Sequence, residues 1–293
     1  MLENIYIARH GYRADFEDSS VLTSVTGMFK DPPLAESGLK QADELATFLS
    51  RPPAPLPTPD ALFSSPFHRT MQTIQPLALA LEQDVSLEHG AGEWFSPAAP
   101  GSGLLPRPAG PSTLQDHFDM KLADYDATYF PKREGEKLDD LTERIDTFLS
   151  AFVRRVEAER PDVRTLLIVS HAAVVVQVGR ALTGDYALDF PAATASLSLY
   201  RRKGLSSLSA ARAHGGVRGE LFGPGKPVLG DWEVVFKNSV EHLSGGVQHS
   251  WGFADLNLLP NGDVVFDAGD GKPFTDADLL PVGLAEEFKA YVK

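Results

Sequence analysis

The sequence contains no cysteine, which excludes disulfide bridges and thiolate metal sites and is typical of a protein in a reducing compartment. It also lacks any apolar run near the roughly 20 residues needed to cross a bilayer, so no membrane span is expected. The apolar stretch near the N-terminus is short and is followed by arginines, which does not fit a secretion signal. We therefore expect a soluble cytoplasmic or nuclear protein that is not secreted.

Basic residues are also scarce. The sequence has 27 lysines and arginines and 40 acidic residues, which gives a net charge of −13. This excess of negative charge argues against direct nucleic-acid binding or membrane-surface binding by the chain alone. Any local cluster of arginines is therefore an exception that indicates a specific anion site. The 293 residues, 43% of them hydrophobic, predict one core domain with insertions or a tail.

Strand and helix patterns alternate from the N-terminus to about residue 203. The predicted strands are residues 3–8, 61–65, 85–87, 165–170 and 196–200. The predicted helices are residues 35–50, 66–82, 137–159 and 172–182. This alternation predicts an α/β fold, a three-layer α/β/α sandwich with a mainly parallel sheet.

The composition changes within residues 204–267, which are first rich in Gly, Ser and Ala and then carry aromatic and β-branched runs. We predict a core domain over residues 1–203 and a β-rich C-terminal extension over residues 204–293, packed on the core as one or two hairpins. Gly and Pro content predicts two inserted loops in the core domain, at about residues 14–32 and 95–135. Such loops would cover a site and decide its specificity.

Charged and polar side chains follow four of the predicted strands. In chain order they are Arg9, His10 and Arg13, then Arg69, then Glu93, and then His171. Ligands of an open parallel sheet bind at the carboxyl ends of its strands, which meet at one edge. The six side chains together predict a site for an anion with chemistry done by histidine.

Converging arginines need an anion of more than one charge between them, and their forks match phosphate oxygens. A histidine among them stays neutral near pH 7 and keeps a nucleophilic ring nitrogen, because like charge disfavours its protonated form. We predict that one of the two histidines displaces the alcohol of a phosphomonoester through a phosphohistidine, with no metal or other cofactor required. Glu93 is the candidate that protonates the leaving alkoxide, and Glu88 is the alternative.

Three short blocks resemble the histidine phosphatase superfamily, whose fold is phosphoglycerate mutase-like. The blocks are Arg9-His10-Gly11, Ser64-Ser65-Pro66 followed by Arg69, and Ser170-His171-Ala172. The catalytic residues that this resemblance implies are His10, Glu93, Arg9 and His171, with His10 as the phosphorylated nucleophile. The phosphate ligands that it implies are Arg9, Arg13, Arg69 and His171. No metal site is implied.

Arginine at position 13 resembles the branch of ecdysteroid-phosphate and protein-tyrosine phosphatases, whereas mutases of the family prefer a small polar residue there. We therefore expect hydrolysis of a phosphorylated small molecule or phosphopeptide, and no mutase activity. The segments IYIARHGYR, GEWF, GDWEVVF and HLSGG also resemble the fungal phosphatase-like subunits of transcription factor TFIIIC. That resemblance implies an alternative function, a scaffold subunit with protein partners in an RNA polymerase III transcription complex that retains a phosphatase pocket.

Other aromatic and histidine residues allow two interpretations. Tyr12, Phe16 and Trp94 fit either a wall for the substrate or the hydrophobic core. His242 and His249 lie seven positions apart, but no paired carboxylates are near them in the sequence. No metal site is predicted there.

Overall fold

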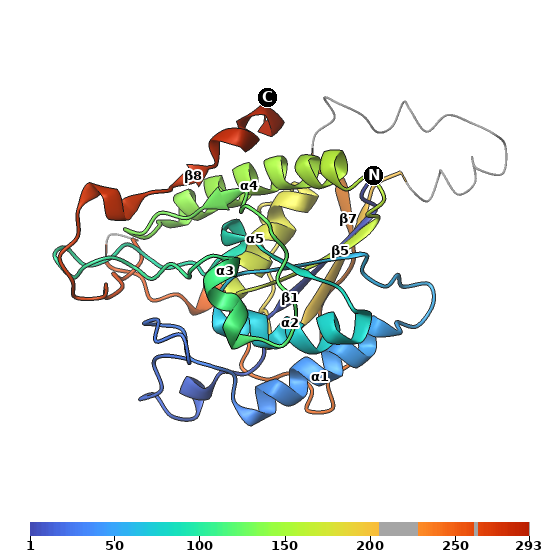
Figure 1. Cartoon of the computed structure of the whole chain (residues 1–293), viewed down its shortest axis with the longest axis horizontal. Coiled ribbons are helices and arrows are strands. Elements are labelled where there is room, and N and C mark those ends of the chain that lie inside the picture. The colour runs from blue at the N-terminus through green and yellow to red at the C-terminus, as the bar shows by residue number, and fades with distance from the viewer. Residues whose placement is uncertain (205–227, 261–262, 293) are drawn as a thin grey trace.

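The computed structural model describes residues 1–204, 228–260 and 263–292, and its centre is a six-stranded sheet of order β3-β2-β5-β1-β6-β7 (Figure 1). Its strands are β1 (Asn4–Arg9), β2 (Ala61–Ser64), β3 (Val85–Leu87), β5 (Thr165–Ser170), β6 (Leu197–Arg202) and β7 (Trp232–Ser239). The first four run parallel, and β6 and β7 are antiparallel additions. The predicted mainly parallel sheet is confirmed.

Long helices cover both faces of this sheet (Figure 1). They are α1 (Glu36–Ser50), α2 (His68–Leu81), α4 (Leu138–Glu159) and α5 (Ala172–Thr183). Successive side chains of β1 point to opposite faces, so Ile5 and Ile7 join the core under α4 and α5, while Tyr6 and Ala8 join the core under α1 and α2. The three-layer sandwich is therefore confirmed.

The two inserted loops contain little regular structure. Their short elements are η1 (Ala14–Phe16), α3 (Pro111–Leu114), η3 (Gln115–His117) and β4 (Tyr129–Phe130). Strand β4 pairs with the two-residue strand β8 (Gly283–Leu284) and so links an insertion to the C-terminal extension. Within the described ranges, no helix combines the length and the apolar character needed to cross a membrane.

The C-terminal extension continues the central sheet, because β7 pairs antiparallel with β6. Trp232 at the start of β7 is fully buried in the core under α4 and α5, and its indole donates a hydrogen bond to the carbonyl oxygen of Val228 at 3.1 Å. Extra C-terminal strands are present as expected, but β7 extends the sheet instead of forming a separate hairpin. Most of the Gly-, Ser- and Ala-rich stretch, residues 205–227, lies outside the described residues. The division between residues 1–203 and 204–293 stays a prediction.

The burial of Trp232 gives a direct test of how firmly the extension belongs to the core. The variant Trp232→Ala should lower the free energy of unfolding by ~3–5 kcal/mol, because a large apolar side chain is removed from a filled core. Urea titration followed by circular dichroism measures this change. The matched control on the same strand is Val234→Ala, whose side chain is 39% exposed and should cost less than about 1 kcal/mol. Equal effects of the two variants would show that Trp232 is not part of the cooperative core.

Candidate functional site

His10 follows the last residue of β1 and is 1% exposed. Its Nδ1 lies 2.8 Å from the carbonyl oxygen of Gly11, and since a carbonyl can only accept, Nδ1 carries the proton and Nε2 keeps a lone pair. The His10 backbone N–H donates to the Ser170 carbonyl at the end of β5. Burial, and then the charges of Arg69 and Arg9, hold the pKa of His10 well below its usual value. The ring is therefore neutral and its free nitrogen is available to attack.

Arg9 is held from behind by the backbone. Its Nη1 donates to the carbonyl oxygens of Ala192 at 2.7 Å and His249 at 2.6 Å. Its buried Nε has no hydrogen-bond partner among the described residues. Burial, and then repulsion by Arg13, lower the pKa of Arg9 to about 9. Arg9 thus remains charged at neutral pH and has a donor to spare for an anion.

Arg13 has a carboxylate partner that the sequence reasoning missed. Its Nε and Nη2 donate to the two carboxylate oxygens of Asp15 at 2.8 and 2.6 Å, and its guanidinium lies 4.4 Å from the ring centre of Phe16. The paired fork fixes the orientation of the side chain. Nη1 stays outside this pair. Acidic neighbours two residues away are common, so the sequence carried no specific signal for the contact.

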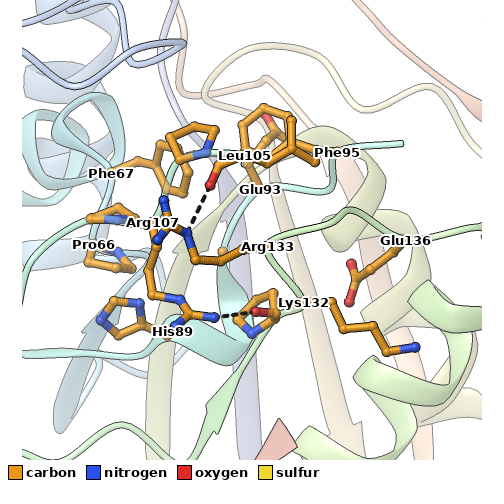
Figure 2. Close-up of a pocket in the computed structure, with 14 residues that line it drawn as sticks. Pro66, Phe67, His89, Glu93, Phe95, Leu105, Arg107, Lys132, Arg133 and Glu136 are labelled. Atoms are coloured by element: carbon orange, nitrogen blue, oxygen red, sulfur yellow. Dashed lines mark hydrogen bonds between the residues drawn. The ribbon is translucent and has the colours of Figure 1, made fainter. Parts of the chain in front are cut away.

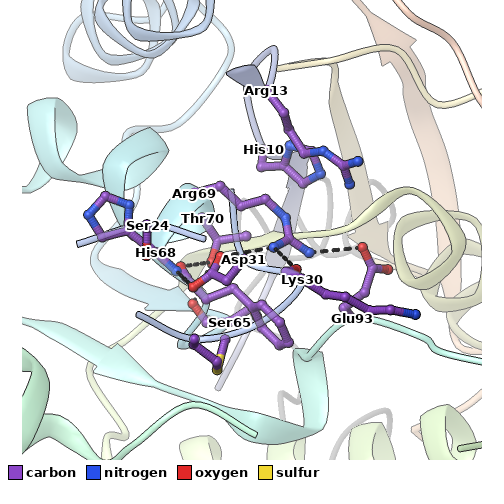
Figure 3. Close-up of polar contacts among 12 residues, drawn as sticks. His10, Arg13, Ser24, Lys30, Asp31, Ser65, His68, Arg69, Thr70 and Glu93 are labelled. Atoms are coloured by element: carbon purple, nitrogen blue, oxygen red, sulfur yellow. Dashed lines mark hydrogen bonds and ion pairs between the residues drawn. The ribbon is translucent and has the colours of Figure 1, made fainter. Parts of the chain in front are cut away.

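Arg69, in the first turn of α2, lies between two carboxylates (Figure 3). Its Nη1 donates to Asp31 at 2.9 Å, and its Nη2 donates to Glu93 at 3.0 Å and lies 3.2 Å from Nδ1 of His171. Asp31 is 1% exposed and also accepts the backbone N–H of His68. Asp31 thus positions Arg69, a function that no motif in the sequence indicated.

His171 is the residue before α5 and is fully buried. Its Nε2 lies 2.8 Å from the hydroxyl of Ser65, and its ring centre lies 5.5 Å from that of His10. Its Nδ1 lies 3.3 Å from the carboxylate of Glu93. Burial is the main cause that lowers the pKa of His171 to about 4, so the ring is neutral at pH 7. Both nitrogens already have protein partners.

Glu93 and Glu88, the two candidates for the acid, occupy different surroundings. Burial alone would raise the pKa of Glu93, but its interactions with His171 and Arg69 outweigh burial, and the pKa lies below its usual range. Glu93 is therefore ionised at rest. Glu88 is fully buried and accepts backbone N–H groups of Gly90 and Thr128. The geometry places Glu93, and not Glu88, at the cavity described next.

A cavity of about 520 Å³ opens over His10. The lining side chains discussed so far are Arg9, His10, Arg13, Phe16 and Glu93. The first residues of α5, Ala172 and Ala173, also line it, and the N-terminus of a helix offers free N–H groups and a positive dipole end to an anion. Arg69 and His171 contact Glu93 from behind but do not line the cavity, so their expected contacts with phosphate stay predictions.

The aromatic residues and the two histidines that the sequence left open differ in their positions relative to this cavity. Phe16 and Trp94 line it, whereas Tyr12 packs edge-on against Phe16 at 5.2 Å. The His249 ring stacks on Phe16 with ring centres 3.5 Å apart. Nε2 of His242 instead lies 3.0 Å from the carbonyl oxygen of Ala195. The two histidines thus have separate structural contacts, and His249 brings the C-terminal extension into the site.

A second, smaller cavity also has Glu93 in its lining (Figure 2). Its volume of about 30 Å³ leaves room for one or two water molecules. Arg107 and Arg133 line it and donate to the carbonyl oxygens of Pro131 and Leu105 at 2.7 and 3.1 Å. The larger cavity is therefore the one that can take a substrate.

The site has one set of atoms with the spacing of metal ligands. His10, Glu93 and His171 each offer a donor atom, and these atoms lie within 4.8 Å of one another. Three guanidinium groups surround the set, and Arg69 already binds the carboxylate of Glu93. Positive charge at this density repels a cation, so the arrangement suits an anion better.

The buried neutral histidine His171 makes stability depend on pH. Its pKa is about 4 in the folded chain and about 6.5 when unfolded, so the unfolded chain gains a proton as the pH falls through this window. The contribution of neutral His171 to the free energy of unfolding is complete above pH 6.5. Between pH 6.5 and pH 5 this contribution should fall by about 1–2 kcal/mol. Urea titrations at both pH values should show a smaller loss in His171→Asn. The exposed His117→Asn is the control, and equal slopes in all three proteins would contradict the prediction.

Comparisons with known proteins agree with this geometry. A family model described as the histidine phosphatase superfamily (branch 1) matches residues 5–204. The transcription factor tau 55 kDa subunit of Saccharomyces cerevisiae is 39% identical over 186 residues, which are 63% of this chain and 42% of that protein. The chain thus spans less than half the length of this relative.

Solved structures show the same fold at low sequence identity. The ecdysone phosphate phosphatase from Bombix mori, in complex with tungstate, superposes with a TM-score of 0.53 at 18% identity, covering 69% of this chain and 90% of that one. A protein named mycobacterial hydrolase 1 gives a TM-score of 0.51 at 18% identity, covering 81% of this chain and 99% of that one. Because the family model covers more than half of its residues, the chain belongs to the histidine phosphatase superfamily, branch 1.

Proposed function

We propose that this protein is a metal-independent phosphomonoesterase that works through a phosphohistidine on His10. The observation that carries the proposal is the fixed tautomer of His10 in a cavity lined by Arg9 and Arg13. A neutral imidazole with a free Nε2 is a nucleophile, and arginine forks stabilise the charge on the equatorial oxygens of a transferring phosphoryl group. Family membership supports the same chemistry.

In the first step, Nε2 of His10 forms a bond to phosphorus while the bond from phosphorus to the ester oxygen breaks. Arg9 and Arg13, which line the cavity, would bind the phosphoryl oxygens. The N–H groups at the start of α5 are a further source of donors. The leaving alkoxide takes a proton from the carboxyl group of Glu93. The products are the free alcohol and the phosphohistidine.

The proton on Glu93 has to arrive with the substrate, because His171 and Arg69 hold the pKa of this carboxylate below its usual range in the free protein. A phosphate ester has its second pKa near 6, so in mildly acidic solution it binds partly as a monoanion that carries a proton. Its negative charge also offsets the arginines and raises the pKa of Glu93. In the second step Glu93 takes a proton from water, the water oxygen bonds to phosphorus, and the bond to His10 breaks. We expect the best turnover at mildly acidic pH.

The test is to trap the phosphoenzyme. The protein is mixed with p-nitrophenyl phosphate, quenched within milliseconds under denaturing alkaline conditions, and analysed by peptide mass spectrometry. We expect a phosphate on His10 that is stable to base and labile to acid, and steady turnover that a chelator does not change. Turnover that requires an added metal ion, or that leaves His10 unmodified, would overturn the proposal.

We propose a second role, as a subunit of a TFIIIC-like transcription complex in the nucleus. The supporting observation is the 39% identity to a transcription factor tau subunit. The two roles are compatible, because a scaffold subunit can keep a working pocket. Affinity purification of the tagged chain from native extract should recover polymerase III transcription factors, and His10→Ala should recover them equally. Recovery of no such protein under gentle conditions would contradict this role.

A further inference from the structure

One side of the substrate cavity is built by residues outside the part of the chain that the family model matches. We name residues 249–257 and 264–267 the C-terminal wall. Its members in the cavity lining are His249, Trp251, Leu256, Asn257, Val264, Val265, Phe266 and Asp267. The family model ends at residue 204. The carbonyl oxygen of His249 in this wall supports Arg9, but none of the wall's side chains has a step in the phosphoryl transfer proposed at His10.

Asp267 fastens the C-terminal wall to both inserted loops. One carboxylate oxygen forms an ion pair with Lys30 of the first loop. The other accepts the backbone N–H of Ser96 at 3.0 Å and its hydroxyl at 3.1 Å, both from the second loop. The Asp267 backbone adds hydrogen bonds with Pro97 and Ala99. A single side chain therefore joins three segments that are distant in sequence, at the rim of the cavity.

The chemistry of the C-terminal wall differs from that of the phosphate end. Leu256, Val264, Val265 and Phe266 face the cavity together with the indoles of Trp94 and Trp251. Burying an apolar group against such a surface is favourable at about 25 cal/mol per Å². The charged groups of the same lining that would bind a phosphate are Arg9 and Arg13. The cavity volume of about 520 Å³ is in the range that holds a small-molecule ligand.

We propose that the C-terminal wall, held by Asp267, determines specificity and selects small phosphomonoesters whose leaving group is an apolar, ring-containing alcohol or phenol. This inference rests on the proposed phosphatase function. The phosphate binds at the arginine end, and the ring of the leaving group lies against the C-terminal wall. Asp267 is a positioning residue, because it acts through the segment that it fastens. Phe266 contacts the leaving group directly.

The test compares two aryl phosphates with leaving groups of similar acidity, 2-naphthyl phosphate and phenyl phosphate. The measured quantity is the ratio of their kcat/KM values, which cancels changes common to both substrates. We expect the natural protein to prefer the naphthyl ester by about tenfold or more, since the second ring adds apolar contact. Phe266→Ala, at a side chain that is 52% exposed, should reduce this preference at least threefold. Phe274→Ala, 47% exposed and outside the cavity lining, should keep it.

The contacts of Asp267 are tested in the same assay. Asp267→Ala should bring the ratio toward that of Phe266→Ala, and Lys30→Met should shift it in the same direction by less. The matched control is Asp270→Ala, which removes an aspartate of the extension that does not line the cavity and accepts only backbone N–H groups of Leu104 and Lys272. Unfolding curves check that each variant folds.

The outcomes separate this inference from the proposed function. A natural protein that hydrolyses both esters through His10 without preferring the naphthyl ester overturns the inference and leaves the phosphatase intact. An unchanged ratio in both Phe266→Ala and Asp267→Ala does the same. If neither ester is hydrolysed in a manner that depends on His10, the proposed function itself fails, and the specificity inference falls with it.

Discussion

Replacing His10 with alanine should lower kcat for p-nitrophenyl phosphate by about 10⁴-fold or more, to the level of the solution reaction plus binding alone. The reason is that the variant loses the only ring whose free nitrogen lines the cavity in the described structure and whose tautomer is fixed by a carbonyl. The arginines remain, so substrate binding should weaken much less than turnover. Steady-state kinetics at pH 5.5 measures both parameters.

The control for His10→Ala is the exposed His117→Ala, which should retain full activity. An unfolding curve close to that of the natural protein would show that the lost activity is chemical. Retention of more than about 1% of kcat would contradict the role of His10 and would direct attention to the other histidines of the site, first His171 and then His249. The double variant would then tell whether His171 carries the remaining turnover.

The variant Glu93→Gln should affect alkyl and aryl phosphates very differently. A glutamine keeps the shape and the hydrogen bond from the Trp94 backbone but cannot give a proton to the leaving oxygen. An alkyl phosphate, whose alkoxide is a poor leaving group, should lose about 10²–10⁴-fold in kcat. p-Nitrophenyl phosphate, whose phenolate leaves without a proton, should lose less than about tenfold. Equal losses for the two substrates would assign Glu93 to binding or to structure instead.

The same residue governs the pH profile. Glu93 must be protonated in the substrate complex, so turnover of alkyl phosphates should fall as the pH rises above its pKa in that complex. The pKa of Glu93 in the free protein is low because of His171 and Arg69. The pH of highest turnover should therefore be acidic. In Glu93→Gln this alkaline limb should disappear for alkyl substrates. If turnover in Glu93→Gln still fell at alkaline pH, the fall would come from titration of the substrate or of a group other than Glu93.

The parts of the fold and site that the sequence predicted are those with local signals. The runs that became β1 and β5 are nearly continuous apolar stretches, because strands in the middle of a parallel sheet are buried on both faces. The end of a strand fixes which residue reaches the ligand edge of the sheet. His10 and His171 each follow the end of a strand, and their ring centres lie 5.5 Å apart. The geometry of each motif follows from a few adjacent residues.

The parts that could not be predicted depend on contacts across long stretches of chain. Asp31 looked like an ordinary loop aspartate, and its pairing with Arg69, 38 residues further along the chain, arises only when the first inserted loop folds back. The run around Val265 resembled a strand, yet the structure uses its residues for isolated bridges and for a cavity wall. Some of its partners, Ser96 and Ala98, lie about 170 residues away in the second inserted loop.

The backbone support of Arg9 couples the site to the extension thermodynamically. Its guanidinium donates to the carbonyl oxygens of His249 and Ala192, and Ala192 in turn exchanges two backbone hydrogen bonds with Trp251. An anion that binds Arg9 must therefore stabilise the folded form of this C-terminal segment. The reason is that a ligand stabilises the state to which it binds, together with the contacts that hold its binding residue in that state. Anion occupancy would be visible far from the phosphate, as slower amide hydrogen exchange at Trp251. By reciprocity, a partner that orders residues 249–251 would tighten the affinity of the pocket for phosphate.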